Sequence, residues 1–187
     1  TDRLETIWNN KKQQKVRELM LEDKTVTGCR DCVHIEQLGK QSLRQSMNSI
    51  FARHIDKATD TMPSFNLKYF DSRFNNLCNL SCRMCYHGSS SSWHKPAVEI
   101  GLIDKSTPVY IKAGRTKTDL YDQFVTQLDN VERIYFAGGE PLMIQDNYDI
   151  LEELDKRQKH HVELVYNTNM TQHKLRGRDI FDLWKNF

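Results

Sequence analysis

Residues 131–141 read VERIYFAGGEP, a short apolar run that leads directly into two glycines, an acidic residue and a proline. The run Val131–Phe136 has the length and the β-branched and aromatic content of a strand, and Ile134-Tyr135-Phe136 is apolar on both faces, as in a strand buried between helices. The two glycines and Pro141 then end the strand. This segment predicts a buried strand with a glycine turn at its carboxyl end.

The same pattern repeats on both sides of this strand. Further strands are predicted at 65–74 and 162–166, and helices at 120–128, 148–154 and 180–184. Alternating strands and helices require a parallel sheet with helical crossovers, so an α/β fold is predicted for residues 63–187. Within the irregular stretch 88–114, a run of four serines is open to two interpretations, a flexible linker or the solvated start of a helix, and composition favours the linker.

Composition sets limits on the class of protein. The 187 residues are 38% hydrophobic, 28% charged and 10% aromatic, which suits a folded chain better than a disordered one. Twenty-seven Lys and Arg against 25 Asp and Glu leave a net charge of +2, which provides no electrostatic basis for binding nucleic acid or an anionic membrane. No apolar run approaches the ~18 residues of a membrane span. The odd, clustered set of five cysteines indicates metal or redox chemistry in a reducing compartment, the cytoplasm.

Three of these cysteines lie in one short segment, Cys78–Cys85, which reads CNLSCRMC and follows the first predicted strand. Soft thiolates at this density favour zinc or an iron–sulfur cluster. Three thiolates on a cubane leave one iron open, whereas a structural zinc site needs a fourth ligand. His87 is the nearest candidate, but it follows Cys85 too closely for a tetrahedral site. The segment therefore favours a cubane cluster.

The cysteine segment and the Gly138-Gly139-Glu140-Pro141 run, taken together, resemble the radical SAM superfamily, whose members act on S-adenosylmethionine (SAM). The family loop is CxxxCxΦC with an aromatic Φ, and Met84 departs from it. The family also carries a Gly-Gly-Glu-Pro run after its second strand. The resemblance covers about residues 65–187 and implies a parallel (β/α) barrel.

The resemblance further implies an activity. Cys78, Cys82 and Cys85 would hold a 4Fe–4S cluster, SAM would bind its open iron, and one-electron reduction would release a 5′-deoxyadenosyl radical that abstracts a substrate hydrogen. Flavodoxin or ferredoxin is the electron donor that such chemistry implies. For Asn167 and Asn169 an ordinary turn after the strand stays an equal alternative. The residues implied to bind SAM are Tyr86, Gly138, Gly139, Glu140, Pro141, Asn167 and Asn169.

Residues 1–62 predict a helical segment that carries the remaining cysteine pair, Cys29-Arg30-Asp31-Cys32. This segment resembles the SPASM/Twitch module of radical SAM enzymes, here placed before the core. The resemblance implies that Cys29 and Cys32 ligate a second, auxiliary iron–sulfur cluster. Its other cysteine ligands would lie outside the 187 residues. A zinc or structural role is the alternative. Enzymes with this module commonly modify peptides, so a peptide or protein substrate is expected.

Three predicted strands are half of the six in the family core. We therefore expect a partial barrel, truncated after about three strands with the others beyond Phe187, and little activity from these residues alone. Two other functions stay open: a zinc-binding interaction module that uses four of the cysteines, and an iron–sulfur electron carrier without SAM chemistry. The first leaves Cys78 and the glycine turn without a role, and the second does not explain the alternation of strands and helices.

Overall fold

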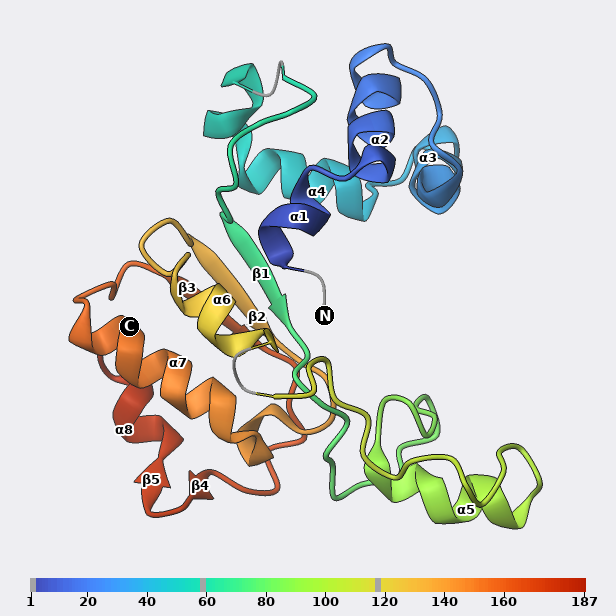
Figure 1. Cartoon of the computed structure of the whole chain (residues 1–187), viewed down its shortest axis with the longest axis vertical. Helices are drawn as coiled ribbons and strands as arrows, with labels where there is room; N and C mark the ends of the chain where they lie inside the picture. The colour runs from blue at the N-terminus through green and yellow to red at the C-terminus, as the bar shows by residue number, and fades with distance from the viewer. Residues whose placement is uncertain (1–2, 58–59, 117–118) are drawn as a thin grey trace. The chain divides into compact units, whose positions relative to one another are not determined.

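The computed structural model describes residues 3–57, 60–116 and 119–187 (Figure 1). These residues form two compact units: one ends at Phe65, and the other is Asn66–Phe187. None of the helices in the described ranges has the length and apolar character to span a bilayer.

The N-terminal unit is helical, as its amphipathic pattern predicts. Side chains cap two of its helices: Asn10 accepts a hydrogen bond from the Gln13 amide, and Ser42 and Gln45 form a reciprocal capping box. Its elements are α1 (Leu4–Trp8), α2 (Lys11–Leu21), a 3-10 turn (Thr27–Cys29), α3 (Arg30–Gln37), α4 (Leu43–Ile50) and a second 3-10 segment (Ala52–Lys57).

This unit has little core of its own. Among its described residues only Ser42 is buried. Trp8 joins the two ends of the unit: its indole N–H donates to the Pro63 carbonyl (3.2 Å), its ring contacts Phe65 edge-on, and the Arg17 guanidinium lies 5.0 Å from the ring centroid. The unit is therefore held by a few aromatic and polar contacts rather than by a buried apolar centre.

The C-terminal unit is built on a parallel sheet, which confirms the predicted α/β class. Its strands are β1 (Tyr69–Ser72), β2 (Arg133–Phe136) and β3 (Glu163–Tyr166), with β2 in the centre. Each strand is shorter than the predicted run. After β3 the chain adds a two-residue antiparallel hairpin, β4 (Lys174–Leu175) and β5 (Arg178–Asp179), which the sequence pattern did not predict.

Helices cover one face of this sheet (Figure 1). They are α6 (Tyr121–Val125), α7 (Gln145–Lys156) and α8 (Ile180–Trp184), while α5 (His94–Glu99) belongs to the excursion between β1 and β2. The side chains with no exposed surface include Phe124, Ile134, Phe136, Leu151 and Leu154, which form one core with the helices. The opposite face carries the partly exposed Tyr135 and Val165, so the expectation that β2 is buried on both faces is wrong for the described residues.

The serine run is not a linker, which corrects the composition-based interpretation. Ser91–Trp93 forms a 3-10 turn that leads directly into α5, and Ser90 is buried. The run is therefore the start of a helix, as in the second interpretation, but it is packed rather than solvated, because the other three serines are partly buried. Composition misled because serine is equally common in linkers and at helix starts, and only tertiary contacts distinguish the two.

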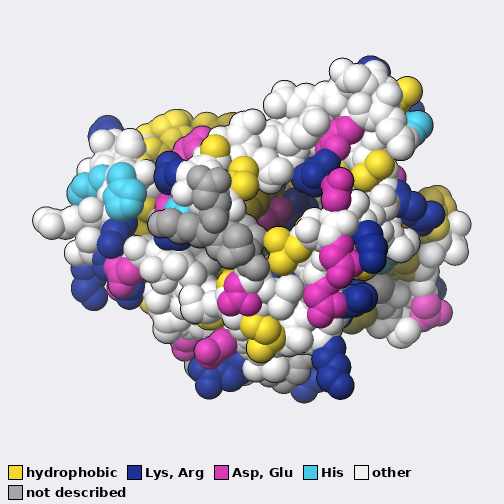
Figure 2. Space-filling view, turned by 90° about the horizontal axis from the view of Figure 1, so that it is seen from above, with side chains coloured by type: hydrophobic (Ala, Val, Ile, Leu, Met, Phe, Trp, Pro, Cys, Tyr) yellow, Lys and Arg dark blue, Asp and Glu magenta, His cyan; other side chains and the backbone are white. Residues whose placement is uncertain are grey.

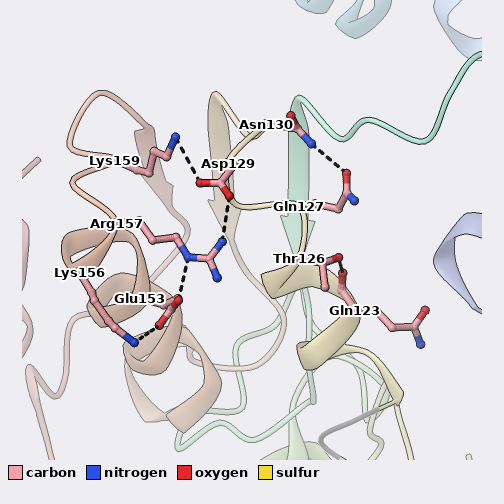
Figure 3. A network of polar contacts seen from close by, with 9 residues as sticks. All are labelled: Gln123, Thr126, Gln127, Asp129, Asn130, Glu153, Lys156, Arg157 and Lys159. Atoms are coloured by element: carbon pink, nitrogen blue, oxygen red, sulfur yellow. Dashed lines mark hydrogen bonds and ion pairs between the residues drawn. The ribbon is translucent and has the colours of Figure 1, made fainter.

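Polar contacts join the end of α7 to the loop before β2 (Figure 3). Arg157 donates to Glu153 one turn earlier (2.7 Å) and reaches Asp129 across the loop (3.3 Å), and Lys159 reaches the same carboxylate (3.3 Å). The arginine hydrogen bond lowers the pKa of Glu153.

On the face shown in Figure 2, basic and acidic side chains are interspersed, in keeping with the balanced charge of the sequence.

We predict that Leu151→Ala lowers the free energy of unfolding by ~2–5 kcal/mol, because Leu151 has no exposed surface and truncation leaves a cavity in the core. Urea denaturation measures the change. Leu102→Ala removes the same atoms at a position 65% exposed in the same unit and should stay within ~0.5 kcal/mol. Equal losses in the two variants would contradict this placement of the core.

Candidate active site

The sheet register brings three loops to one edge. Ser72, Phe136 and Tyr166 pair across the sheet as the last residues of their parallel strands. The loops that follow are the cysteine loop (residues 78–85), the glycine turn (residues 137–141) and the β3 loop (residues 167–171). In open α/β sheets ligands bind beyond the carboxyl ends of the strands, so this edge is the candidate active site.

The glycine turn contacts the chain just before the cysteine loop, backbone against backbone. The Gly139 amide donates to the Asn75 carbonyl (3.1 Å), and the Glu140 amide donates to the Leu77 carbonyl (2.7 Å). A Cβ on Gly139 would lie 2.0 Å from the Leu77 carbonyl oxygen, and Gly138 has a φ of +103°. The close approach that these glycines permit is therefore made to the chain itself.

Glu140 connects the second loop to the third. Its side chain is 1% exposed and accepts hydrogen bonds from the Leu142 amide (3.0 Å), the Asn169 amide (2.7 Å) and the Thr168 hydroxyl. A carboxylate has about four acceptor positions, so these three donors leave one acceptor position on Glu140. The sequence argument assigned Glu140 to ligand binding alone and missed its structural role.

The β3 loop also reaches the cysteine loop. The Asn169 side-chain amide donates to the Asn79 side chain (3.1 Å) and lies 3.9 Å from the Cys78 sulfur. Asn79 in turn donates to the Thr171 hydroxyl (2.7 Å). Asn167 is exposed, and its amide continues the strand pairing by donating to the Phe136 carbonyl (3.0 Å). The structure thus brings Asn169 to the cysteines and leaves the Asn167 side chain in solvent.

The three thiols of the cysteine loop are free, and two of them lie close enough to the third to affect its pKa. Cys82 is exposed, while Cys78 and Cys85 are partly buried. Burial raises the pKa of the Cys85 thiol, and the charges of Cys82 and Cys78 raise it further. Tyr86, the next residue, is 59% exposed, and its carbonyl accepts the amides of Ser89 and Ser90.

The donor set fits an iron–sulfur cluster by its chemistry. Within the described ranges, no group of three or more His, Cys, Asp or Glu side chains converges as a single metal ion requires, and His87 does not join the thiols. In a cubane each thiolate binds a different iron, so its ligands need not converge on one point. Three soft thiols in one loop suit such a cluster.

Several residues that hold the cysteine loop were not predicted. Ser90, Ser91, Ser92 and Trp93 all bond to it through their side chains, from the run interpreted as a linker. Their position directly after the cysteines was a usable signal, because hydroxyls can bond to loop backbone that has no partner in a sheet or helix.

The second cysteine pair lies in the N-terminal unit. Cys29 ends a 3-10 turn, Cys32 is in the first turn of α3, and both thiols are free and partly buried. A pocket of about 380 Å³ adjoins Cys29, and Arg44 and Met20 are among its lining residues. The structure does not bring a third metal ligand to the pair within the described residues.

The sequence profile of the radical SAM superfamily matches residues 72–187, which include the cysteine loop, the glycine turn and the β3 loop. The chain belongs to the radical SAM superfamily. No curated protein sequence and no solved structure matches it. Members of the superfamily are enzymes that generally bind a 4Fe–4S cluster and SAM and carry out SAM-dependent radical chemistry.

We predict that Gly139→Ala destabilises the C-terminal unit by about 1–3 kcal/mol, since the new methyl group would overlap a main-chain oxygen that cannot rotate away. Thermal unfolding followed by circular dichroism measures the shift. Gly28→Ala, where a Cβ would meet nothing within 4 Å, is the matched control. A small, equal shift in both variants would show that the two loops do not touch at Gly139.

Proposed function

We propose that this chain acts as a radical SAM enzyme in which Cys78, Cys82 and Cys85 hold a 4Fe–4S cluster. The observation that carries the proposal is the pair of main-chain hydrogen bonds, at one sheet edge, that join the glycine turn to Asn75 and Leu77, directly before the cysteine loop. A cofactor held by the first loop and a ligand held by the second would then lie side by side. Preorganised loops of this kind favour binding because little ordering remains to be done.

The chain's own residues would divide the work at this edge. The three thiols must lose their protons to bind iron, and burial raises the pKa of the Cys85 thiol. The acceptor position left on Glu140 would take the ammonium group of SAM, and Asn169 would hold the β3 loop against the cysteines. When bound, cluster and SAM supply the reductive cleavage that yields a 5′-deoxyadenosyl radical.

We further propose that the three strands are part of a parallel (β/α) barrel and that residues 1–62 are a SPASM/Twitch-type segment. Cys29 directly precedes α3 and Cys32 lies in its first turn, so the two thiols stand three positions apart, as in a CxxC pair that shares a ligand. They would ligate an auxiliary iron–sulfur cluster together with cysteines from outside these residues. A peptide or protein substrate, a flavodoxin or ferredoxin as electron donor, and a cytoplasmic location complete the proposal.

Anaerobic reconstitution with iron and sulfide tests the assignment of the core cysteines. We expect Cys82→Ala to lose the absorbance and the iron of the core cluster, because two thiolates do not replace three. Cys29→Ala should keep them, since it lies in the other unit. Equal loss of iron in both variants contradicts two separate sites. Zinc without sulfide in the unchanged chain would support a zinc-binding module, and a cluster without SAM binding would support an electron carrier.

Glu140→Gln tests the SAM site. The substitution keeps the size and one acceptor oxygen but removes the charge that would face an ammonium group, so we expect SAM affinity to fall about tenfold. Isothermal titration of SAM into the anaerobically reconstituted protein measures it, with iron content unchanged. Glu163→Gln, a carboxylate 56% exposed at the opposite end of β3, is the control. Equal SAM affinity in the unchanged chain and in both variants would contradict the role assigned to Glu140.

A further inference from the structure

The segment Ser90–Trp93, called the serine clamp here, is hydrogen-bonded to the main chain of the cysteine loop. Ser91 bonds to both polar main-chain groups of Cys78: its hydroxyl accepts from the amide (3.1 Å) and donates to the carbonyl (3.1 Å). Ser92 donates to the same carbonyl (2.8 Å). The backbone of the first cysteine is therefore bound by two neighbouring hydroxyls.

The second cysteine is bound by an aromatic side chain. The Trp93 indole N–H donates to the Cys82 carbonyl (2.8 Å), which also accepts the Cys85 amide (2.9 Å). Between these points, Ser90 donates to the Leu80 carbonyl (2.7 Å). The clamp thus contacts the loop at Cys78, Leu80 and Cys82, along the whole stretch that separates the first two thiols.

The clamp is itself anchored beside the sheet. The Ser91 amide donates to the carbonyl of Asn76, a residue 2% exposed. The Asn76 side chain donates to the His87 carbonyl (2.9 Å) and the Val109 carbonyl (3.1 Å), and accepts the Ile111 amide (2.9 Å). A buried side chain with all of these partners is held rigidly. Asn76 follows β1, so the serine clamp fixes the cysteine loop relative to the end of this strand.

We propose that Ser91, Ser92 and Trp93 are positioning residues that hold Cys78 and Cys82 in the conformation that ligates the cluster. This inference rests on the proposed function. Holding an irregular loop in one conformation costs chain entropy, and hydrogen bonds to its main chain offset this cost. Each neutral bond of this kind changes an equilibrium by roughly two- to tenfold. Loss of the Ser91 hydroxyl removes two bonds, and loss of the Trp93 N–H removes one.

The test compares Ser91→Ala and Trp93→Phe with two matched controls. Ser89→Ala removes a hydroxyl from the same serine run that makes no hydrogen bond within the described residues. Trp8→Phe removes the indole bond to Pro63 in the other unit. Two properties are measured for each protein: amide hydrogen exchange of peptides covering residues 78–85 in the metal-free chain, and the rate of iron loss to a chelator after anaerobic reconstitution.

We expect Ser91→Ala to speed both processes about tenfold and Trp93→Phe about threefold, with both controls unchanged and all melting temperatures within a few degrees. Ser91→Thr keeps the hydroxyl and should restore both rates and the electron paramagnetic resonance spectrum of the reduced cluster. A general loss of structure would not be rescued in this way.

Exchange and iron loss that match the controls in both clamp variants would overturn the inference and leave the proposed function standing. Failure of the unchanged chain to take up iron and sulfide would instead overturn the proposed function. In that case the exchange measurement on the metal-free chain still decides whether the clamp orders the loop.

Discussion

The candidate site depends on a contact in which no side chain takes part. Two main-chain amides of the glycine turn bond to the carbonyls of Asn75 and Leu77, at the start of the cysteine loop. No residue larger than glycine fits at position 139, because the Leu77 oxygen occupies the space of a Cβ. This contact joins the ends of β1 and β2 beyond the last sheet hydrogen bonds, and the positions of the other loops follow from it.

The remaining cross-links are built around that contact. Buried Asn147 on α7 accepts from the Ser72 hydroxyl and donates to the Pro141 carbonyl, so the helix behind the sheet is bonded to the end of β1 and to the glycine turn. Glu140 then bonds to the β3 loop, and Asn169 returns from the β3 loop to Asn79. Buried polar groups that are satisfied in this way specify one arrangement, because any shift of a loop leaves a donor or acceptor without a partner.

The excursion between β1 and β2 supplies further hydrogen bonds that hold the cysteine loop. The cysteine loop has few hydrogen bonds within itself, and its main-chain groups are bound from outside by the serine clamp, which is in turn bonded to Asn76. The long connection between β1 and β2 therefore contains its own support for the loop, which is a structural reason for its length. Met84, at the position where the family pattern has an aromatic residue, is 93% exposed and adds no contact to this support.

The sequence alone determined the order of the elements and the chemistry of the loops. Apolar runs such as Ile134-Tyr135-Phe136 and stripes such as Tyr148, Leu151 and Leu154 are local patterns, and the structure contains a strand and a helix there. The spacing of Cys78, Cys82 and Cys85 and the turn after β2 identified the superfamily, whose profile matches residues 72–187.

Only the tertiary structure decided how the polar residues are used. Glu140, Asn169 and the serines after the cysteines make bonds to partners 10 to 90 positions away in the chain, and their residue types alone permit a ligand site, a turn or a linker equally well. The exposed face of β2 was missed for the same reason. Hydrophobic periodicity reports which residues can be buried, whereas the layer that covers a face is set by other segments of the fold.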